Sequence, residues 1–451
     1  MFDYEKPNYD LLRRFSRLAV INVLSNLTEP LAGLIGIAFL GHLTEIRYLA
    51  GVSLATVLFS YIYENLLFLR ISTNAVTSQA VGQNDREAML LAGLRNGFIA
   101  VVLSVLILIL QYPLGALGFS LLNGSPEVES IGLVYFNARI WGTPAVLLNL
   151  VFIGWFLGQE QSGKVLLLTF VGNVVNVVLN YFSIVQWNLG SLGAGISQAF
   201  SEYLMLLVAL LLASRSIQWQ ELRTAVRQFW DWSAFKNTFI LNKDLLINSL
   251  VYMSIWTIFL NLSATLGTDV LAENTLVQQV IFLIGFFIEG IGFTTETLTG
   301  NFQGQSAQNQ LLPLLQIAIF TSLLVAIAAS ALCILLPETI FGLLTNHAEV
   351  IDPIKNYVPW LVPILICFSI AWILEGYFAG LAKGQFLRYA AFTAILLGFT
   401  PVAVWAWSAH SNHLLWLAVS AFMATRMVVL GIQLPKTFES NSPAAILKLK
   451  N

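Results

Sequence analysis

The chain has 451 residues, of which 57% are hydrophobic and only 10% are charged, and its mean hydropathy is +0.77. A soluble globular protein carries about 25% charged residues, so a water-soluble fold is excluded as the main architecture. The 22 Lys and Arg residues nearly balance the 24 Asp and Glu residues, which argues against a nucleic-acid partner. Cys333 and Cys367 both lie in apolar runs, so we expect neither a disulfide framework nor a metal site.

Apolar stretches long enough to cross a bilayer recur along the whole chain. A spanning helix needs about 20 apolar residues, whereas the strands of membrane barrels are alternating segments of about ten residues. The sequence therefore predicts an all-α polytopic membrane protein with about twelve transmembrane helices. The expected spans are 16–40, 49–71, 92–114, 134–158, 165–187, 194–214, 245–266, 272–300, 311–336, 356–381, 388–408 and 414–434.

The longest polar stretch divides six expected spans from six. We therefore expect an N-terminal lobe at 1–214, a cytoplasmic inter-lobe loop at 215–243 and a C-terminal lobe at 244–451. If both termini are cytoplasmic, most Lys and Arg residues lie on the cytoplasmic side of the membrane, and the inter-lobe loop holds several of them. The positive-inside rule then predicts a multi-pass protein of a bacterial-type inner membrane with both termini in the cytoplasm.

The two halves of the chain contain an internal repeat. The stretch from Leu49 to Gln83 matches the stretch from Leu271 to Gln305 at an offset of 222 residues, and GWFLG at Gly154 matches GYFAG at Gly376 at the same offset. Because each half has an even number of spans, the copies share their orientation. This predicts two parallel six-helix repeats related by a pseudo-twofold axis along the membrane normal, an arrangement typical of secondary transporters.

Three glutamates of the second half lie inside expected spans. Placing a charged side chain at the bilayer centre costs at least about 2.5–3.5 kcal/mol of insertion free energy, so each of these residues is expected to have a functional or structural role. Glu289 and Glu296 are seven residues apart and share one helix face among several threonines, which favours a cation- or proton-handling surface over a carboxylate that only joins helices. Glu375 lies in a glycine-rich span and is the third ion-coupling candidate after Glu289 and Glu296, with pairing to Lys383 as the structural alternative.

The first half contributes candidates for a substrate cavity. Glu29 precedes Pro30, which removes a backbone hydrogen bond, and Glu64 lies beside tyrosines such as Tyr61. The alternatives are capping of broken backbone for Glu29 and a helix contact for Glu64. Glu202, Arg70 and Arg139 are interpreted as structural, because the sequence shows no partner for them. Three amides recur at helical spacing in the fifth span and either join helices or line the cavity: Asn173, Asn176 and Asn180.

No motif of an enzyme active site is present, and no nucleotide-binding segment could supply energy from ATP. We therefore expect a protein that is not an enzyme, uses no cofactor and draws on an ion gradient.

The segments resemble those of the MATE (multidrug and toxic compound extrusion) family, particularly its DinF-like branch. The resemblance covers nearly the whole chain. Each motif alone is a moderate signal, but their occurrence in this order is specific. In chain order they are SNLTEPLAG with FLGHL, FLR with TSQAVGQ, the R-x-x-G-x-P of Arg139, GWFLG, GNVVNVVLN, IEGIGFTTETLTG and LEGYFAG. It implies a two-lobe, twelve-helix exporter that exchanges a cytoplasmic substrate for external H⁺ or Na⁺ by rocking its lobes. Under this resemblance Glu289, Glu296 and Glu375 match acidic positions of the C-terminal lobe.

Two positions depart from the family pattern. Gly36 and Asn180 stand where many members carry an aspartate, so the resemblance implies that the N-lobe ion site of those members is dismantled here. Glu29 lies seven residues before Gly36 on the same helix face and is a candidate replacement.

The first hypothesis is a monomeric, cation-coupled efflux antiporter for organic small molecules of cationic or amphipathic character. The intramembrane glutamates would give its cavity a negative potential. The alternative is a flippase for lipid-linked substrates, although the extra helices or basic cavity that such proteins commonly need are not evident. A membrane scaffold or receptor would leave the intramembrane acids unexplained.

Overall fold

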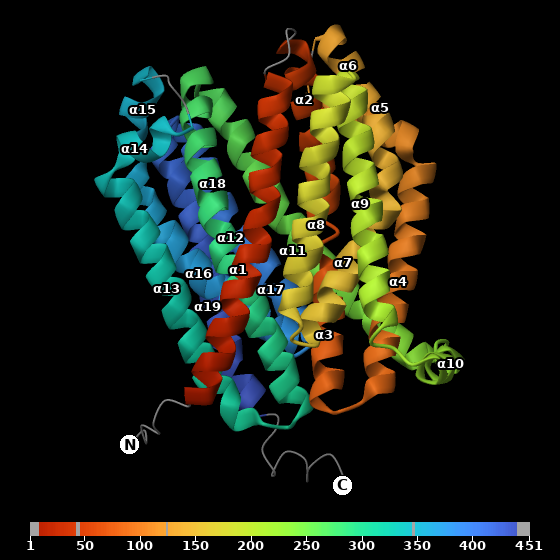
Figure 1. The fold of residues 1–451 in the computed structure, drawn as a ribbon. Helices are drawn as coiled ribbons and strands as arrows, with labels where there is room; N and C mark the ends of the chain where they lie inside the picture. Colours follow the sequence, from red (N-terminus) through yellow and green to blue (C-terminus); the bar gives the residue numbers. More distant parts are fainter. Residues whose placement is uncertain (1–8, 42–45, 123–124, 345–347, 440–451) are drawn as a thin grey trace. The chain divides into compact units, whose positions relative to one another are not determined.

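A computed structural model describes residues 9–41, 46–122, 125–344 and 348–439, and every regular element in these ranges is a helix (Figure 1). The two chain ends, which were expected in the cytoplasm, lie outside the described residues. Twelve helical segments are long and apolar enough to cross a membrane, as expected. They are Tyr9–Gly41, Arg47–Gly82, Arg86–Ile109, Pro126–Gly158, Ser162–Gln186, Gly190–Ser214, Trp232–Leu266, Thr268–Gly304, Gln308–Leu335, Val358–Gly380, Gly384–Ala409 and Asn412–Phe438.

The chain divides into two compact units. Unit 1 comprises Met1–Val23 and Lys243–Asn451, and unit 2 comprises Leu24–Asn242. Both boundaries fall inside helices, because α1 is Tyr9–Gly41 and α11 is Trp232–Leu266. The first half of α1 therefore packs with the C-terminal helices, whereas a division at 215–243 from hydropathy assigns all of α1 to the N-terminal lobe.

Unit 2 contains the second part of α1 and the helices up to the first turns of α11. A short 3-10 segment, η1, joins α6 to α7, and a π-helical segment, η2, continues α8. The remaining elements are α2 (Ile46–Glu64), α3 (Phe68–Gly82), α4 (Arg86–Ile109), α5 (Gln111–Leu122), α6 (Pro126–Arg139), η1 (Ile140–Gly142), α7 (Thr143–Gly158), α8 (Ser162–Asn180), η2 (Tyr181–Gln186), α9 (Gly190–Ser214) and α10 (Trp219–Arg227).

Unit 1 contains the first part of α1, most of α11 and all later helices. A second π-helical segment, η5, lies between α17 and α18 and ends two residues before Pro401, which cannot donate a backbone hydrogen bond. Its elements are α12 (Thr268–Gly304), η3 (Gln308–Gln310), α13 (Leu311–Leu335), α14 (Pro337–Gly342), α15 (Ala348–Ile354), η4 (Val358–Trp360), α16 (Leu361–Gly380), α17 (Gly384–Thr393), η5 (Ala394–Phe399), α18 (Thr400–Ala409) and α19 (Asn412–Glu439).

The repeated GWFLG segment packs α7 tightly against α3 in unit 2. A Cβ on Gly154 would meet the carbonyl oxygen of Arg70, and a Cβ on Gly158 would lie 2.6 Å from the Cβ of Thr77. Small residues one turn apart allow helix backbones in a membrane to approach this closely. The glycines of the repeat are therefore required by packing.

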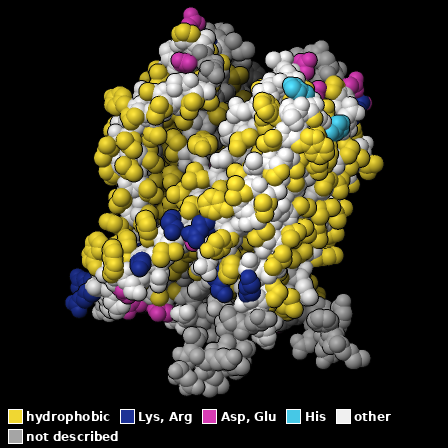
Figure 2. Space-filling model, turned by 180° about the vertical axis from the view of Figure 1, so that it is seen from behind, with side chains coloured by type: hydrophobic (Ala, Val, Ile, Leu, Met, Phe, Trp, Pro, Cys, Tyr) yellow, Lys and Arg dark blue, Asp and Glu magenta, His cyan; other side chains and the backbone are white. Residues whose placement is uncertain are grey.

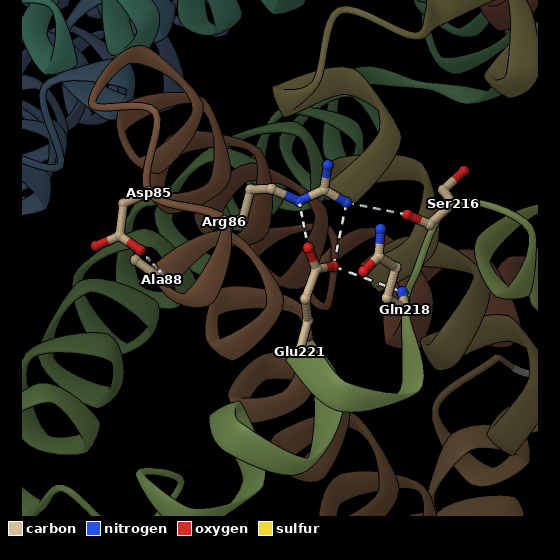
Figure 3. A network of polar contacts seen from close by, with 6 residues as sticks. All are labelled: Asp85, Arg86, Ala88, Ser216, Gln218 and Glu221. Atoms are coloured by element: carbon tan, nitrogen blue, oxygen red, sulfur yellow. Dashed lines mark hydrogen bonds and ion pairs between the residues drawn. The ribbon is translucent and has the colours of Figure 1, made fainter.

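The stretch expected to be an inter-lobe loop is largely helical. It holds α10 and the start of α11, because hydropathy detects apolar spans but not short polar helices. Figure 3 shows the contacts between this stretch and α4: Arg86 pairs with Glu221 at 3.1 Å and donates to the Ser216 carbonyl oxygen at 3.2 Å. In the same view Asp85 accepts a hydrogen bond from the Ala88 amide and so caps α4.

Hydrophobic side chains cover most of the flank seen in Figure 2, and most Lys and Arg side chains on this face lie in its lower part. Large apolar side chains such as Leu34, Val102 and Phe320 are more than one-third exposed, as is expected where lipid is the solvent.

Candidate functional site

In unit 1, close contact between α12 and α16 positions two of the predicted acidic residues. A Cβ on Gly376 would lie 2.5 Å from the carbonyl oxygen of Gly292, and a Cβ on Gly380 would meet the carbonyl oxygen of Glu296. Glycines one turn apart on α16 therefore let its backbone touch that of α12. The Glu296 side chain on α12 is 2% exposed, and Glu375 on α16 is 8% exposed.

Glu375 forms a buried polar group with Arg426 of α19 and Asn248 of α11. Arg426 Nη2 pairs with Glu375 Oε1 and donates to Asn248 Oδ1 at 3.0 Å, while Asn248 Nδ2 donates to Glu375 Oε2 at 3.2 Å. The three side chains come from helices that are distant in sequence. The ion pair at this carboxylate is with Arg426, and not with Lys383, the partner that the sequence suggests.

Tyr252 on α11 brings Glu289 into the same neighbourhood. The Arg426 guanidinium lies over the Tyr252 ring, 5.4 Å from its centroid. The phenol interacts electrostatically with Glu289, Glu375 and Arg426. Glu289 is half-buried, so two of the three predicted ion-coupling acids and a guanidinium lie around one tyrosine. We call Glu289, Glu375, Arg426, Tyr252 and Asn248 the unit 1 cluster.

The threonines beside Glu296 are buried on α12. The hydroxyls of Thr294, Thr295 and Thr297 donate to the carbonyl oxygens one turn earlier, at 3.0, 3.0 and 2.9 Å. Thr294 also accepts a 2.9 Å hydrogen bond from Asn22, in the part of α1 that belongs to unit 1. Their protons are therefore committed to protein partners, so a ligand could engage these hydroxyls only through oxygen lone pairs.

Unit 2 has a break in its second span, at the depth of Glu64. Helix α2 ends at Glu64 and α3 begins at Phe68, although the corresponding stretch of α12 is continuous. Around the break the backbone bonds are of the i to i+3 type, such as Leu66 N to Tyr63 O at 2.9 Å. Interrupted helices at membrane depth leave backbone groups to be satisfied and are typical of binding sites.

The predicted cavity acids of unit 2 lie within electrostatic range of each other. Glu64 is half-buried and interacts electrostatically with Glu29 on α1 and with Arg70 on α3. Arg70 also donates to Asn26 Oδ1 at 3.4 Å. Tyr61 is 46% exposed on α2, whereas its neighbour Tyr63 hydrogen-bonds to Thr143. The structure thus brings Glu29 and Glu64 within electrostatic range of each other, and the Arg70 guanidinium opposes the charge of Glu64.

The three asparagines of α8 have separate partners. Asn173 donates to Thr28 Oγ1 of α1 at 2.9 Å, which joins the two helices. Asn176 donates to Gln198 Oε1 of α9 at 2.9 Å, and Asn180 donates to Asn176 Oδ1 at 3.0 Å. A Cβ on Gly36 would lie 3.5 Å from Asn180 Nδ2, so the two positions without an aspartate are neighbours.

Glu202 and Arg139, for which the sequence shows no partners, are both engaged in unit 2. Glu202 accepts from Asn149 Nδ2 at 2.9 Å and from Gln198 Nε2 at 3.3 Å. Arg139 donates to the Tyr135 hydroxyl at 2.9 Å and lies 4.5 Å from the Phe59 ring centroid. Glu202 and Arg139 also interact electrostatically with each other.

Sequence reasoning missed Arg426 altogether. The only signal available was a basic residue inside the twelfth apolar span, in ATRMVVL. A guanidinium at that depth needs a partner. The rotation of α19 that aims it at α16 is a tertiary property.

Comparisons with known proteins agree on one family. The MatE family profile matches residues 22–182 and again 245–404, so one profile fits both halves. The DNA damage-inducible protein F of Escherichia coli is 29% identical over 91% of this chain and 89% of its own. Multidrug resistance protein MdtK of Pectobacterium atrosepticum is 22% identical over 92% of this chain and 89% of its own.

Solved structures share the fold. An outward-facing multidrug resistance MATE family transporter of the MOP superfamily superposes with a TM-score of 0.84 at 17% identity, covering 98% of this chain and 99% of the other. With the twelve helical segments, this agreement establishes two six-helix repeats as the architecture.

Proposed function

The chain belongs to the MatE family, whose members are transporters and not enzymes, and on that premise we propose that it is a secondary active efflux antiporter. It exports organic small molecules, cationic or amphipathic, in exchange for H⁺ or Na⁺ by alternating access of its two halves. It acts as a monomer in the bacterial inner membrane, with both termini in the cytoplasm.

The observation that carries cation coupling is the set of carboxylates inside apolar spans. Each of these charges costs at least about 2.5–3.5 kcal/mol at the bilayer centre, so a chain that keeps several has a use for them. In unit 1 the carboxylate that we assign to coupling is Glu289, which is half-buried beside Tyr252. Glu375 is already compensated by Arg426, so its role is to hold the cluster, and Glu296 supports the coupling ion nearby.

The substrate contacts that we propose lie in unit 2. Glu29 and Glu64 supply negative charge, and Tyr61 supplies an exposed aromatic face on which a flat organic cation can stack. The amides Asn173, Asn176 and Asn180 supply hydrogen-bonding groups on α8. Carboxylates with an aromatic ring favour a cation over an anionic lipid headgroup.

The experiment is transport by the purified protein in proteoliposomes. Ethidium should move against its gradient when a proton or Na⁺ gradient is imposed, and not without one. Movement of a labelled lipid alone would instead support the flippase alternative and refute the antiporter.

The assignment of Glu289 is tested by Glu289→Gln, which mimics a permanently protonated site. Uphill export should fail, while counterflow, which needs no net coupling, should be less affected. The matched control is Glu127→Gln, an exposed glutamate at the start of α6, which should export normally. Normal uphill export by Glu289→Gln, together with its loss in Glu29→Gln, would move the coupling site to unit 2.

A further inference from the structure

Helix α10 carries an exposed apolar stripe at the edge of unit 2. Trp219 and Val226 are seven residues apart, so they share one face of α10, and Trp230 continues this face just past the end of the helix. The three residues are 78%, 53% and 70% exposed. Ala225, on another side of the helix, is fully buried, and α10 packs against α4. The stripe therefore takes no part in holding α10 to the rest of unit 2.

Two arginines border the apolar stripe. Arg223 and Arg227 are one turn apart and exposed, and among the residues that the structure describes neither has an ion-pair or hydrogen-bond partner. The surrounding segment, 215–236, contains four basic residues and two acidic ones. Of the acidic side chains, Glu221 is in the ion pair of Figure 3, and Asp231 accepts from two backbone amides at the start of α11. The charge of the two arginines is thus available to an external anion.

Contacts with α4 fix the depth of this segment in the membrane. Arg95 donates to the carbonyl oxygens of Gln228 and Phe229 at 3.0 and 3.3 Å, and the ring centroids of Phe98 and Trp230 are 5.8 Å apart. No charged residue follows Arg95 in α4, so this level is where α4 changes from polar to apolar. A spanning helix makes that change at the lipid headgroups. The segment lies there, beside the lower end of α4 (Figure 1).

The stripe is continuous with the lipid-facing flank of unit 2. Beyond Phe98, helix α4 exposes Val101, Val102 and Val105, which is expected where the solvent is lipid. Tryptophan is enriched at membrane interfaces, because its ring is largely apolar and its N–H group needs a polar partner. A soluble protein partner would have to displace lipid to reach the stripe. These observations favour the membrane itself as the occupant.

We propose that α10 is an interfacial anchor that binds anionic phospholipid headgroups. The guanidinium groups of Arg223 and Arg227 bind the lipid phosphate, which matches their fork of N–H donors. Trp219, Val226 and Trp230 lie among the upper parts of the acyl chains, while the apolar stems of the arginines extend back to the headgroups.

The same geometry selects anionic over zwitterionic lipids. A zwitterionic headgroup also has a phosphate, but its own cationic group repels the guanidinium groups of Arg223 and Arg227. Each basic residue close to an anionic membrane surface contributes about a fivefold preference, so the two arginines together contribute about 25-fold. The proposal does not depend on the transport function.

The test measures which lipids surround Trp219 in the full-length protein. The protein is reconstituted into equimolar vesicles of phosphatidylglycerol and phosphatidylcholine, in which one lipid or the other carries bromine on the acyl chain just below the headgroup. Bromine quenches tryptophan fluorescence at short range, and subtracting the signal of Trp219→Phe isolates the contribution of Trp219. Brominated phosphatidylglycerol should quench it more strongly, and this preference should fall about 25-fold in the double variant Arg223→Gln with Arg227→Gln.

The matched control is Arg47→Gln with Lys355→Gln, which removes the same charge from surface ion pairs outside this segment and should keep the preference. High salt should weaken the preference in the wild type, so one arm of the test needs no variant. Absence of quenching by either lipid would place α10 in water or against a protein and would overturn the proposal. Equal quenching by both lipids in the wild type, or an unchanged preference in the double arginine variant, would overturn it as well.

Discussion

Replacing Arg426 by methionine should destabilise unit 1 far more than its loss of packing explains. Arg426 is 2% exposed, and its guanidinium pairs with Glu375 and donates to Asn248. Removing one partner of a buried ion pair leaves the other charge uncompensated, which costs about 3–5 kcal/mol. Methionine keeps the length and much of the volume of the side chain, so the cavity contribution stays small.

The double variant Arg426→Met with Glu375→Gln isolates the ion pair. It removes both charges, and glutamine keeps an oxygen that accepts from Asn248. We expect it to be more stable than Arg426→Met alone, with an interaction energy of about 1–3 kcal/mol between the two positions.

The assay is denaturant unfolding in mixed micelles followed by tryptophan fluorescence, applied to the wild type, both single variants and the double variant. Lys355→Met is the control, because it breaks an exposed pair with Glu338 and should leave the transition unchanged. A double variant whose cost equals the sum of the two single costs would refute the view that Arg426 and Glu375 compensate each other.

Three further predictions concern other contacts. Glu64→Gln should lower affinity for cationic substrates more than for neutral ones in equilibrium binding, and equal losses would exclude a direct charge role. Restoring the family acids with Gly36→Asp and Asn180→Asp should not increase ion-driven export, because the carboxylate introduced on α8 would face the side-chain oxygen of Asn176. A clear gain in export would contradict this prediction. Gly380→Ala should cost about 1–3 kcal/mol of stability, because its Cβ would meet the backbone of α12. Gly431→Ala, whose Cβ would have nothing within 4 Å, should cost little. Equal unfolding midpoints for the two variants would refute the packing argument.

The sequence by itself determined the number of spans, the internal repeat and which acids fall within the apolar spans. These features are local in the sequence. About 20 consecutive apolar residues are long enough to span a bilayer, and the repeat can be recognised by aligning GWFLG with GYFAG. Their structural counterpart, the tight packing of α7 on α3 and of α16 on α12, follows from glycines one turn apart.

Only the tertiary structure decided which side chains meet. Glu375 finds Arg426 on α19, and Glu202 finds Asn149 on α7, because each helix is rotated to satisfy polar groups that lipid cannot solvate. That rotation depends on the packing of all neighbouring helices at once, so no stretch of sequence encodes it. The same holds for the boundary between Val23 and Leu24, where an unbroken apolar helix passes from one compact unit to the other.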